Sequence, residues 1–156
     1  MGAGACGAGV EALARQVGAG LARAGAVVLT GGRGGVMAAA SRGARDAGGL
    51  VVGVLPGAGA AETPPNEAVG VALFTGLGQA RNQVLVLSAR AVVAIGGGWG
   101  TLSEIALALK HGVPVVTLAS WRLARPDGAP EPRLQEAADA GAAVAAALAA
   151  ARRWPR

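Results

Sequence analysis

The sequence is poor in the residues that build aromatic platforms, disulfides and amine catalysts. It has no tyrosine, one phenylalanine, one cysteine and one lysine among 156 residues. Without tyrosine or further phenylalanine there is no aromatic platform on which nucleic-acid bases could stack. A single cysteine, Cys6, excludes an internal disulfide and suits a reducing compartment. We therefore expect a cytoplasmic protein and do not expect nucleic acid as a partner.

Long apolar runs and targeting signals are missing as well. The longest apolar run, residues 142–151, is too short to span a bilayer. Met1 is followed by small residues instead of the basic and apolar regions of a signal peptide. The 14 basic residues exceed the 9 acidic ones, but they are scattered, and only Arg152, Arg153 and Arg156 cluster. This pattern indicates a compositional bias and predicts no membrane association.

Glycine is abundant, with 27 residues, and it gathers in loops between apolar segments. Short continuous apolar runs alternate with segments of helical periodicity, which is typical of a parallel sheet covered on both faces. Predicted strands cover residues 26–30, 50–55, 71–74, 91–95 and 113–118. Predicted helices cover residues 10–24, 36–47, 78–88, 101–111 and 133–151. The sequence thus predicts one α/β domain over residues 1–156, a Rossmann-like three-layer fold with a mostly parallel sheet.

The start of the chain does not fit this pattern. Folds of this kind open with a strand, whereas residues 1–9 are almost entirely glycine and alanine. We expect the first strand to be missing or truncated. Either the encoded protein starts upstream with a Val/Ile-rich strand, or the domain lacks its central strand. Gly2, Gly4 and Gly7 match the dinucleotide fingerprint literally, but its strand and its acidic residue are absent, so NAD is not expected.

Two other glycine loops carry a stronger signal. Residues 31–35 and 96–100 each follow a predicted strand and open a helix. Bare N–H groups at a helix N-terminus form an anion site, and glycine allows a phosphate to approach the backbone closely. The alternative is that both loops are only tight turns. Two such loops on the same edge of the sheet favour phosphate binding.

Arg81 and Glu104 are the candidate functional side chains. Arg81 lies in the first turn of a predicted helix, where a cation is unfavourable unless an anion binds nearby; the alternative is a solvated surface arginine. Thr101 and Glu104 have the spacing of a capping box, which would occupy the carboxylate with a backbone amide. Alternatively, Glu104 lies beside the anion site. Trp99 is predicted to pack or to form a stacking surface.

Three segments together resemble the Lonely Guy superfamily, whose members are often mislabelled lysine decarboxylases. They are residues 31–37 (GGRGGVM), Arg81, and residues 96–104 (GGGWGTLSE), within a likeness that runs from about Gly4 to Leu118. The resemblance implies cleavage of the N-glycosidic bond of cytokinin riboside 5′-monophosphates by an arginine and a glutamate. Arg81 and Glu104 match those two catalytic positions.

Two departures from the enzymes' motifs are similar to a sister branch that includes molybdenum cofactor carrier proteins. Gly96 replaces the proline of the glycine motif, and residues 75–82 replace a Met-His-x-Arg-Lys type segment. The resemblance to that branch implies binding of a phosphorylated pterin without known chemistry. A carrier of a nucleotide or pterin and a nucleoside 5′-monophosphate phosphoribohydrolase therefore both remain as hypotheses.

The loops and the resemblance together give the expected ligand set. The residues expected to bind the ligand are Gly31, Gly32, Gly34, Gly35, Met37, Gly97, Gly98, Gly100 and Thr101. No metal-ligand cluster is visible in the sequence, and no cofactor is required, although AMP-like nucleotides and molybdenum cofactor are candidate ligands. The resemblance implies a homo-oligomer, a dimer or a tetramer. A lysine decarboxylase is excluded because Lys110, predicted at a helix C-terminus, is the one lysine available for a Schiff base.

Overall fold

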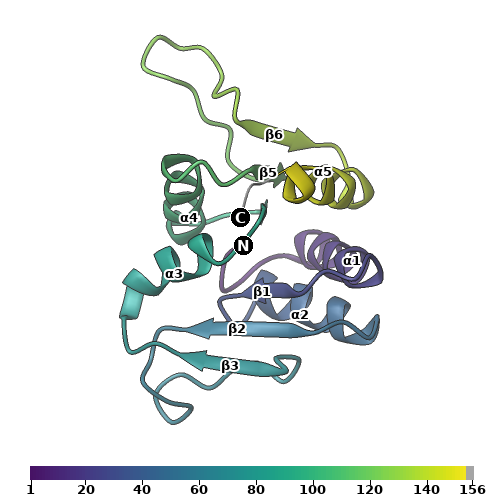
Figure 1. The fold of residues 1–156 in the computed structure, drawn as a ribbon, viewed down its shortest axis with the longest axis vertical. Helices are drawn as coiled ribbons and strands as arrows, with labels where there is room; N and C mark the ends of the chain where they lie inside the picture. The colour runs from purple at the N-terminus through teal and green to yellow at the C-terminus, as the bar shows by residue number, and fades with distance from the viewer. Residues whose placement is uncertain (154–156) are drawn as a thin grey trace.

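The computed structural model describes residues 1–153 and contains two parallel three-stranded sheets (Figure 1). The first sheet has the order β1-β2-β3, and the second has the order β4-β5-β6. Their bounds are β1 Val28–Thr30, β2 Val51–Leu55, β3 Val71–Phe74, β4 Val92–Ile95, β5 Val115–Leu118 and β6 Leu134–Ala137. Every strand pair is parallel. The predicted α/β class and its Rossmann-like arrangement are confirmed.

Helices flank both sheets and connect the strands. Their bounds are α1 Ala8–Arg23, α2 Val36–Asp46, α3 Arg81–Leu87, α4 Trp99–Lys110 and α5 Ala140–Arg153. A 3-10 turn, η1, covers Gly78–Ala80 and leads directly into α3. Because crossover helices cover the faces of a parallel sheet, its strands are continuous apolar runs instead of alternating ones. All four residues of β5 are buried accordingly.

The predicted helix over residues 133–151 is wrong at its start. Residues 134–137 form β6, which pairs with β5 in the register Leu134 opposite Val115. The segment is an edge strand with polar residues at its centre, so it lacks the apolar run that indicates a buried strand. Helix α5 begins only at Ala140. The preceding residue is Asp139, whose Oδ1 accepts a hydrogen bond from the Ala142 N–H at 2.8 Å. That contact is an N-cap, and it separates strand from helix.

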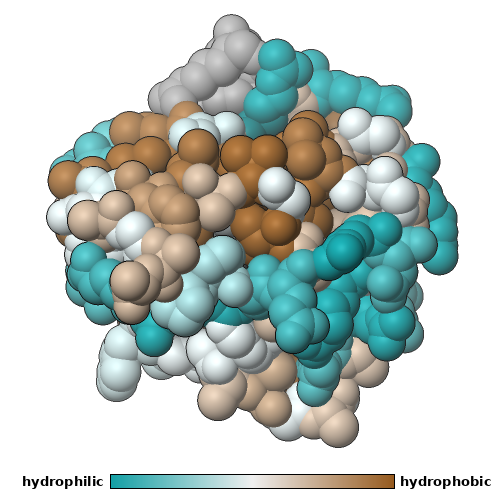
Figure 2. All heavy atoms as spheres, turned by 90° about the horizontal axis from the view of Figure 1, so that it is seen from below, coloured by the Kyte–Doolittle hydropathy of each residue, from teal (hydrophilic) through white to brown (hydrophobic). Residues whose placement is uncertain are grey.

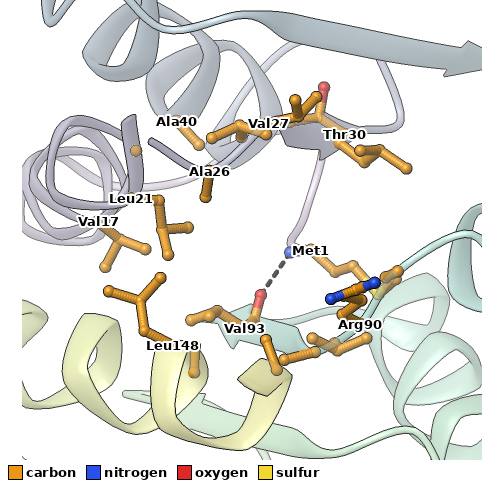
Figure 3. Close-up of a pocket in the computed structure, with 18 of the residues that line it drawn as sticks. Met1, Val17, Leu21, Ala26, Val27, Thr30, Ala40, Arg90, Val93 and Leu148 are labelled. Carbon is orange, nitrogen blue, oxygen red and sulfur yellow. Dashed lines mark hydrogen bonds between the residues drawn. The ribbon is translucent and has the colours of Figure 1, made fainter. Parts of the chain in front are cut away.

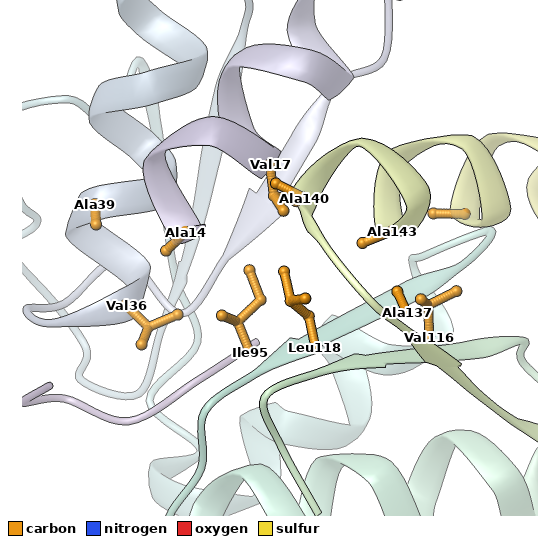
Figure 4. Close-up of a cluster of buried hydrophobic side chains, with 11 residues drawn as sticks. Ala14, Val17, Val36, Ala39, Ile95, Val116, Leu118, Ala137, Ala140 and Ala143 are labelled. Carbon is orange, nitrogen blue, oxygen red and sulfur yellow. The ribbon is translucent and has the colours of Figure 1, made fainter. Parts of the chain in front are cut away.

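The main core is built from small side chains on α1, α2 and α5 against β4 and β5 (Figure 4). Helices α1 and α2 approach so closely that a Cβ at Gly18 would lie 2.0 Å from the Ala40 carbonyl oxygen. A Cβ at Gly43 would lie equally close, 2.0 Å, to the Arg15 carbonyl oxygen. Only glycine permits this backbone contact. The two helices therefore form one rigid layer over the sheets.

A gap separates the two sheets, and the start of the chain lies in it. No strand precedes α1 within residues 1–153, as expected for a fold whose first strand is missing or truncated. Met1 occupies the gap and hydrogen-bonds to β4, and the chain then runs to the carboxyl edge of the sheets. The loops after β1 and β4 also end at this edge, which places three glycine-containing segments side by side.

Candidate functional site

A cavity of about 320 Å³ opens where these three segments meet helices α3 and α4. Its lining residues are Gly2, Ala3, Gly4, Arg33, Gly34, Met37, Gln79, Arg81, Asn82, Gly98, Gly100, Thr101 and Glu104. This is the carboxyl edge of a parallel α/β sheet, where such folds bind their ligands. The cavity is therefore the candidate binding site.

Arg81 and Glu104 come together in this cavity, as the sequence predicts. The Arg81 Nη1 and Glu104 Oε1 atoms lie 3.7 Å apart, with side chains only 10% and 8% exposed. Arg81 is the first residue of α3 and is buried, so it is not a solvated surface arginine. Its Nη1 atom is buried without a hydrogen-bond partner. A buried, unpaired guanidinium nitrogen is costly, and an anionic ligand in the cavity would satisfy it.

Positive charge exceeds negative charge around the cavity. Burial raises the pKa of Glu104, while the Met1 ammonium and Arg81 lower it. Burial lowers the pKa of Arg81; Glu104 opposes that shift, and Arg33 adds to it. One carboxylate, Glu104, thus shares the cavity with the two guanidinium groups of Arg33 and Arg81. This balance favours a bound anion.

The predicted capping box at Thr101 and Glu104 does not form. Helix α4 begins two residues earlier, at Trp99, with Gly98 as an extended N-cap that offers no side-chain hydrogen bond. The Gly98 carbonyl accepts the first hydrogen bond of the helix, from Leu102 N at 3.1 Å. Thr101 lies inside the first turn, where its buried Oγ1 has no partner. Glu104 lies in the second turn and is not a cap.

The first turn of α4 is open toward the cavity. Because the first helical hydrogen bond is donated by Leu102, the N–H groups of Trp99, Gly100 and Thr101 have no partner within the helix. A Cβ built at Gly98 or Gly100 would meet no atom within 4 Å. The backbone there is bare and accessible, so a phosphate can reach it.

The other predicted glycines support the site without lining its cavity. A Cβ at Gly31 would lie 2.7 Å from both Arg81 Nη2 and Met37 Sδ, so this glycine makes room for the guanidinium. Gly32 and Gly35 adopt φ angles of 71° and 59° in the turn before α2. A Cβ at Gly97 would lie 2.7 Å from Trp121 Nε1. These residues shape the loops, while Gly34, Met37, Gly98, Gly100 and Thr101 reach the cavity.

Sequence reasoning missed several lining residues. Residues 2–4 line the cavity because the Ala3 carbonyl accepts a hydrogen bond from Val36 N at 3.1 Å, at the start of α2. Their glycine-rich composition was the available signal. Asn82 also lines the cavity and is buried with an unpaired Oδ1. Its position next to Arg81 in a first helical turn could have indicated it.

Trp99 packs against another side chain, as the first of its two alternatives predicts, and its role as a stacking surface stays a prediction. Its ring packs against Trp121 with centroids 5.5 Å apart and planes tilted by 36°. Trp121 Nε1 in turn donates a hydrogen bond to the Gly98 carbonyl at 3.3 Å. Trp99 is nevertheless 79% exposed, next to the open N-terminus of α4. An aromatic surface therefore lies beside the free backbone N–H groups at the start of α4.

The remaining candidates lie elsewhere in the fold. Cys6 packs against the main core, and His111 follows the last turn of α4. Lys110 ends α4, at the opposite end of that helix from Gly98. Across residues 1–153 no group of three or more His, Cys, Asp and Glu side chains could hold a metal ion. Within the same residues, no helix is long and apolar enough to span a membrane.

Comparison with known proteins agrees with this geometry. The family model of the SLOG cluster4 family matches residues 1–148. An uncharacterized protein from Archaeoglobus fulgidus is 42% identical over 118 residues, 76% of each chain. The molybdenum cofactor carrier protein of Chlamydomonas reinhardtii has 34% identity and a TM-score of 0.82, with 98% of this chain and 95% of that chain covered.

A further solved structure points the same way. The molybdenum cofactor binding protein of the phototrophic bacterium Rippkaea orientalis is 36% identical, with a TM-score of 0.79. The match covers 90% of this chain and 86% of that chain. The predicted resemblance to the Lonely Guy superfamily, nearest its carrier-like branch, is confirmed.

Proposed function

We propose that this chain, which belongs to the SLOG cluster4 family, binds a phosphorylated heterocyclic small molecule in the cavity at the start of α4. The observation that carries the proposal is the set of buried polar atoms left without a partner there. Arg81 Nη1, Asn82 Oδ1 and Thr101 Oγ1 all belong to lining residues. Buried polar atoms are nearly always paired, so a polar ligand is the expected partner.

The phosphate would lie at the N-terminus of α4. The partial positive charge of a helix N-terminus and its free N–H groups form an anion site. Gly98 and Gly100 leave the space that the phosphate oxygens need. Arg81 and Arg33 would neutralise its charge, with Arg81 able to form two parallel hydrogen bonds. Each charge-assisted hydrogen bond stabilises binding by about 1.5–3 kcal/mol.

The heterocycle would lie against the exposed ring of Trp99. A volume of about 320 Å³ is at the lower end of the range for small-molecule sites. Two similar structures are a molybdenum cofactor carrier and a molybdenum cofactor binding protein. We therefore propose a pterin such as molybdenum cofactor, or an AMP-like nucleotide. The chain's own groups require no resident cofactor for this role.

Native mass spectrometry of freshly purified protein tests the proposal. We expect a fraction of the 15.0 kDa chain to carry additional mass, which denaturation releases as a phosphorylated heterocycle. The Gly98→Val variant should purify without it, because the side chain fills the phosphate position. A released compound without phosphate would contradict the proposal. So would an unliganded protein that binds neither AMP nor sulfate.

A second candidate function is phosphoribohydrolase activity, and the buried Glu104 carboxylate favours it. Cleavage of an N-glycosidic bond develops positive charge on the ribose, which a nearby carboxylate stabilises. Glu104 lies 3.7 Å from Arg81, which would orient the phosphate-bearing ligand. Burial raises the pKa of Glu104, however, and this disfavours the ionised form that such catalysis needs. Binding without efficient turnover is therefore the better-supported function.

Release of free base from AMP separates the two functions. We expect no turnover of AMP near the ordinary enzyme range of ~1–1,000 per second. Chromatography of AMP incubated with the purified protein measures adenine directly. If adenine does appear, a catalytic Glu104 predicts that Glu104→Gln lowers the rate by roughly 100- to 1,000-fold, with AMP affinity retained. Rapid adenine release with that loss would replace the carrier proposal by the hydrolase.

The edge strand β3 supports the expected self-association. Its side chains Val71, Leu73 and Phe74 are exposed, and Figure 2 shows apolar surface gathered on the face seen from the β3 side of the molecule. Edge strands with exposed apolar side chains pair readily with other chains. We propose that this chain is a homo-oligomer, a dimer or a tetramer.

A further inference from the structure

A second cavity lies away from the candidate site, in the gap between β1 and β4. It measures about 560 Å³. Figure 3 shows Val27 and Thr30 on one side, Val93 on the other, and Leu21 and Leu148 closing one face. Most of the surrounding side chains are aliphatic. An apolar cavity of this size is unfavourable in a packed core, because its lining atoms have lost their contacts.

The strands on both sides of this cavity have unpaired edges. In a parallel sheet, alternate residues direct their N–H and C=O groups to opposite neighbours. Val28 N donates to the Leu50 carbonyl at 3.0 Å, so Leu29 directs its own groups into the gap. Val92 N donates to the Pro114 carbonyl at 2.8 Å, so Val93 also faces the gap. Two strand edges therefore face each other across an apolar space.

Met1 already has the position of a strand residue. Its nitrogen donates to the Val93 carbonyl at 2.5 Å. Its carbonyl accepts a hydrogen bond from Ile95 N at 2.9 Å. In a parallel ladder, one residue bonds in this way to the two residues that flank its partner. Met1 therefore lies opposite Ala94, between residues 93 and 95. Residues joined ahead of Met1 in the same direction would lie between β1 and β4.

The ammonium group of Met1 is poorly placed where it is. Burial in this apolar space lowers its pKa, opposed by the charge of Glu104. A peptide N–H at the same point would donate the same hydrogen bond to Val93 without a buried charge. The position thus suits an internal residue of a strand better than a charged group.

We infer that the gap is a strand-binding site that accepts an extended apolar segment joined to the amino end of Met1, parallel to both β1 and β4. At about 3.3 Å per residue, four or five residues would fill the length of β4. Helices cover both faces, with Val17 on one and Leu85 on the other, so the segment would be apolar at every position. Its insertion would join the two sheets into one. This inference rests on the cavity and on the two open strand edges. It does not depend on the ligand proposed for the cavity at α4.

Three N-terminal extensions of equal length test the inference. Five residues, Val-Val-Ile-Val-Val, are fused ahead of Met1 and compared with Ser-Gly-Ser-Gly-Ser. A third version, Val-Val-Pro-Val-Val, is equally apolar but lacks one ladder N–H. We expect the first to raise the Tm by more than about 10 °C, from the burial of apolar side chains. The serine–glycine version should leave the Tm unchanged, and the proline version should give less than half the rise.

Hydrogen exchange provides the second measurement. The amides of Leu29 and Val93 should become protected at least tenfold in the Val-Val-Ile-Val-Val protein and not in the serine–glycine protein. Equal Tm values for all three proteins would overturn the inference. So would unchanged exchange at both amides, because a segment lying elsewhere on the surface could raise the Tm but could not pair with these edges.

Discussion

AMP is expected to raise the Tm of this chain, and substitution of Gly98 by valine is expected to remove that rise. Gly98 precedes α4 with an extended backbone, φ −112° and ψ −169°, which valine adopts readily. A Cβ there meets no atom within 4 Å, so the folded structure should accept the side chain. The methyl groups would instead fill the space in which we place the phosphate.

The size of the effect follows from mass action. At 100 times its Kd, AMP stabilises the folded state by about 2.7 kcal/mol. In a chain of this size, each kcal/mol shifts the Tm by roughly 2–4 °C, so the parent protein should gain roughly 5–11 °C. Gly98→Val should gain less than about 1 °C, and its Tm without AMP should stay near that of the parent.

Gly9→Val is the matched control for this experiment. Gly9 lies in the first turn of α1, a Cβ there also meets nothing within 4 Å, and the residue does not line the cavity. Differential scanning fluorimetry with increasing AMP compares the three proteins. Gly9→Val should retain the full rise. A rise that survives in Gly98→Val, or is lost equally in both variants, would contradict phosphate binding at α4.

The second large effect concerns the buried pair of Arg81 and Glu104. Removal of one partner from a buried ion pair costs about 3–5 kcal/mol, because the other charge remains buried. Burial lowers the pKa of the Met1 amine, so this group gives Glu104 little compensation near pH 8. We expect a Tm loss of at least roughly 6 °C for Arg81→Met at that pH. Glu104→Gln should lose stability by a similar amount.

The two variants should differ in their pH dependence. In Arg81→Met, the pKa of Glu104 is raised further above its unfolded value, since the guanidinium that lowered it is gone. A raised carboxyl pKa favours folding below the unfolded pKa of about 4.3, and this stability is lost as the pH rises through the folded value. The Tm deficit of Arg81→Met relative to the parent should therefore be smaller at pH 5 than at pH 8.

In Glu104→Gln the remaining buried charge cannot be neutralised by a change of pH, because the guanidinium of Arg81 remains protonated at every accessible pH. Its Tm deficit relative to the parent should not shrink between pH 8 and pH 5, because the raised pKa of Glu104 favours the folded parent toward lower pH. The double variant Arg81→Met/Glu104→Gln removes both charges and should recover most of the loss at pH 8. Thermal melts of the four proteins at the two pH values measure these differences. A pH-independent deficit in Arg81→Met would show that Glu104 is not a buried carboxylate.

The strands and glycine loops were predictable because their physical signals are local. A buried parallel strand is a continuous apolar run, and β5 at Val115–Leu118 lies within the predicted strand 113–118. Strand β6 gave no such signal, because its middle residues Gln135 and Glu136 are exposed at a sheet edge. Pairing with β5 determines its conformation, and a long-range contact of that kind leaves no periodicity in the sequence.

The site was predictable to the extent that topology alone determines it. Arg81 and Glu104 follow strands of one parallel arrangement, so their helices begin at the same edge. The start of α4 was not predictable, because the spacing of Thr101 and Glu104 satisfies the capping pattern equally well. The part played by residues 2–4 depends on the hydrogen bond between Ala3 and Val36, which joins segments distant in sequence.

Residues 1–4 physically link two distant parts of the molecule. Met1 is hydrogen-bonded in the central gap, while Gly2, Ala3 and Gly4 line the ligand cavity. Any event that orders one end of this segment changes the free energy of ordering the other, and thermodynamic coupling of this kind is reciprocal. Added residues ahead of Met1 would therefore change ligand affinity, and a bound ligand would change how firmly they insert. An amino-terminal extension that inserts into the gap is therefore expected to alter the binding site as well.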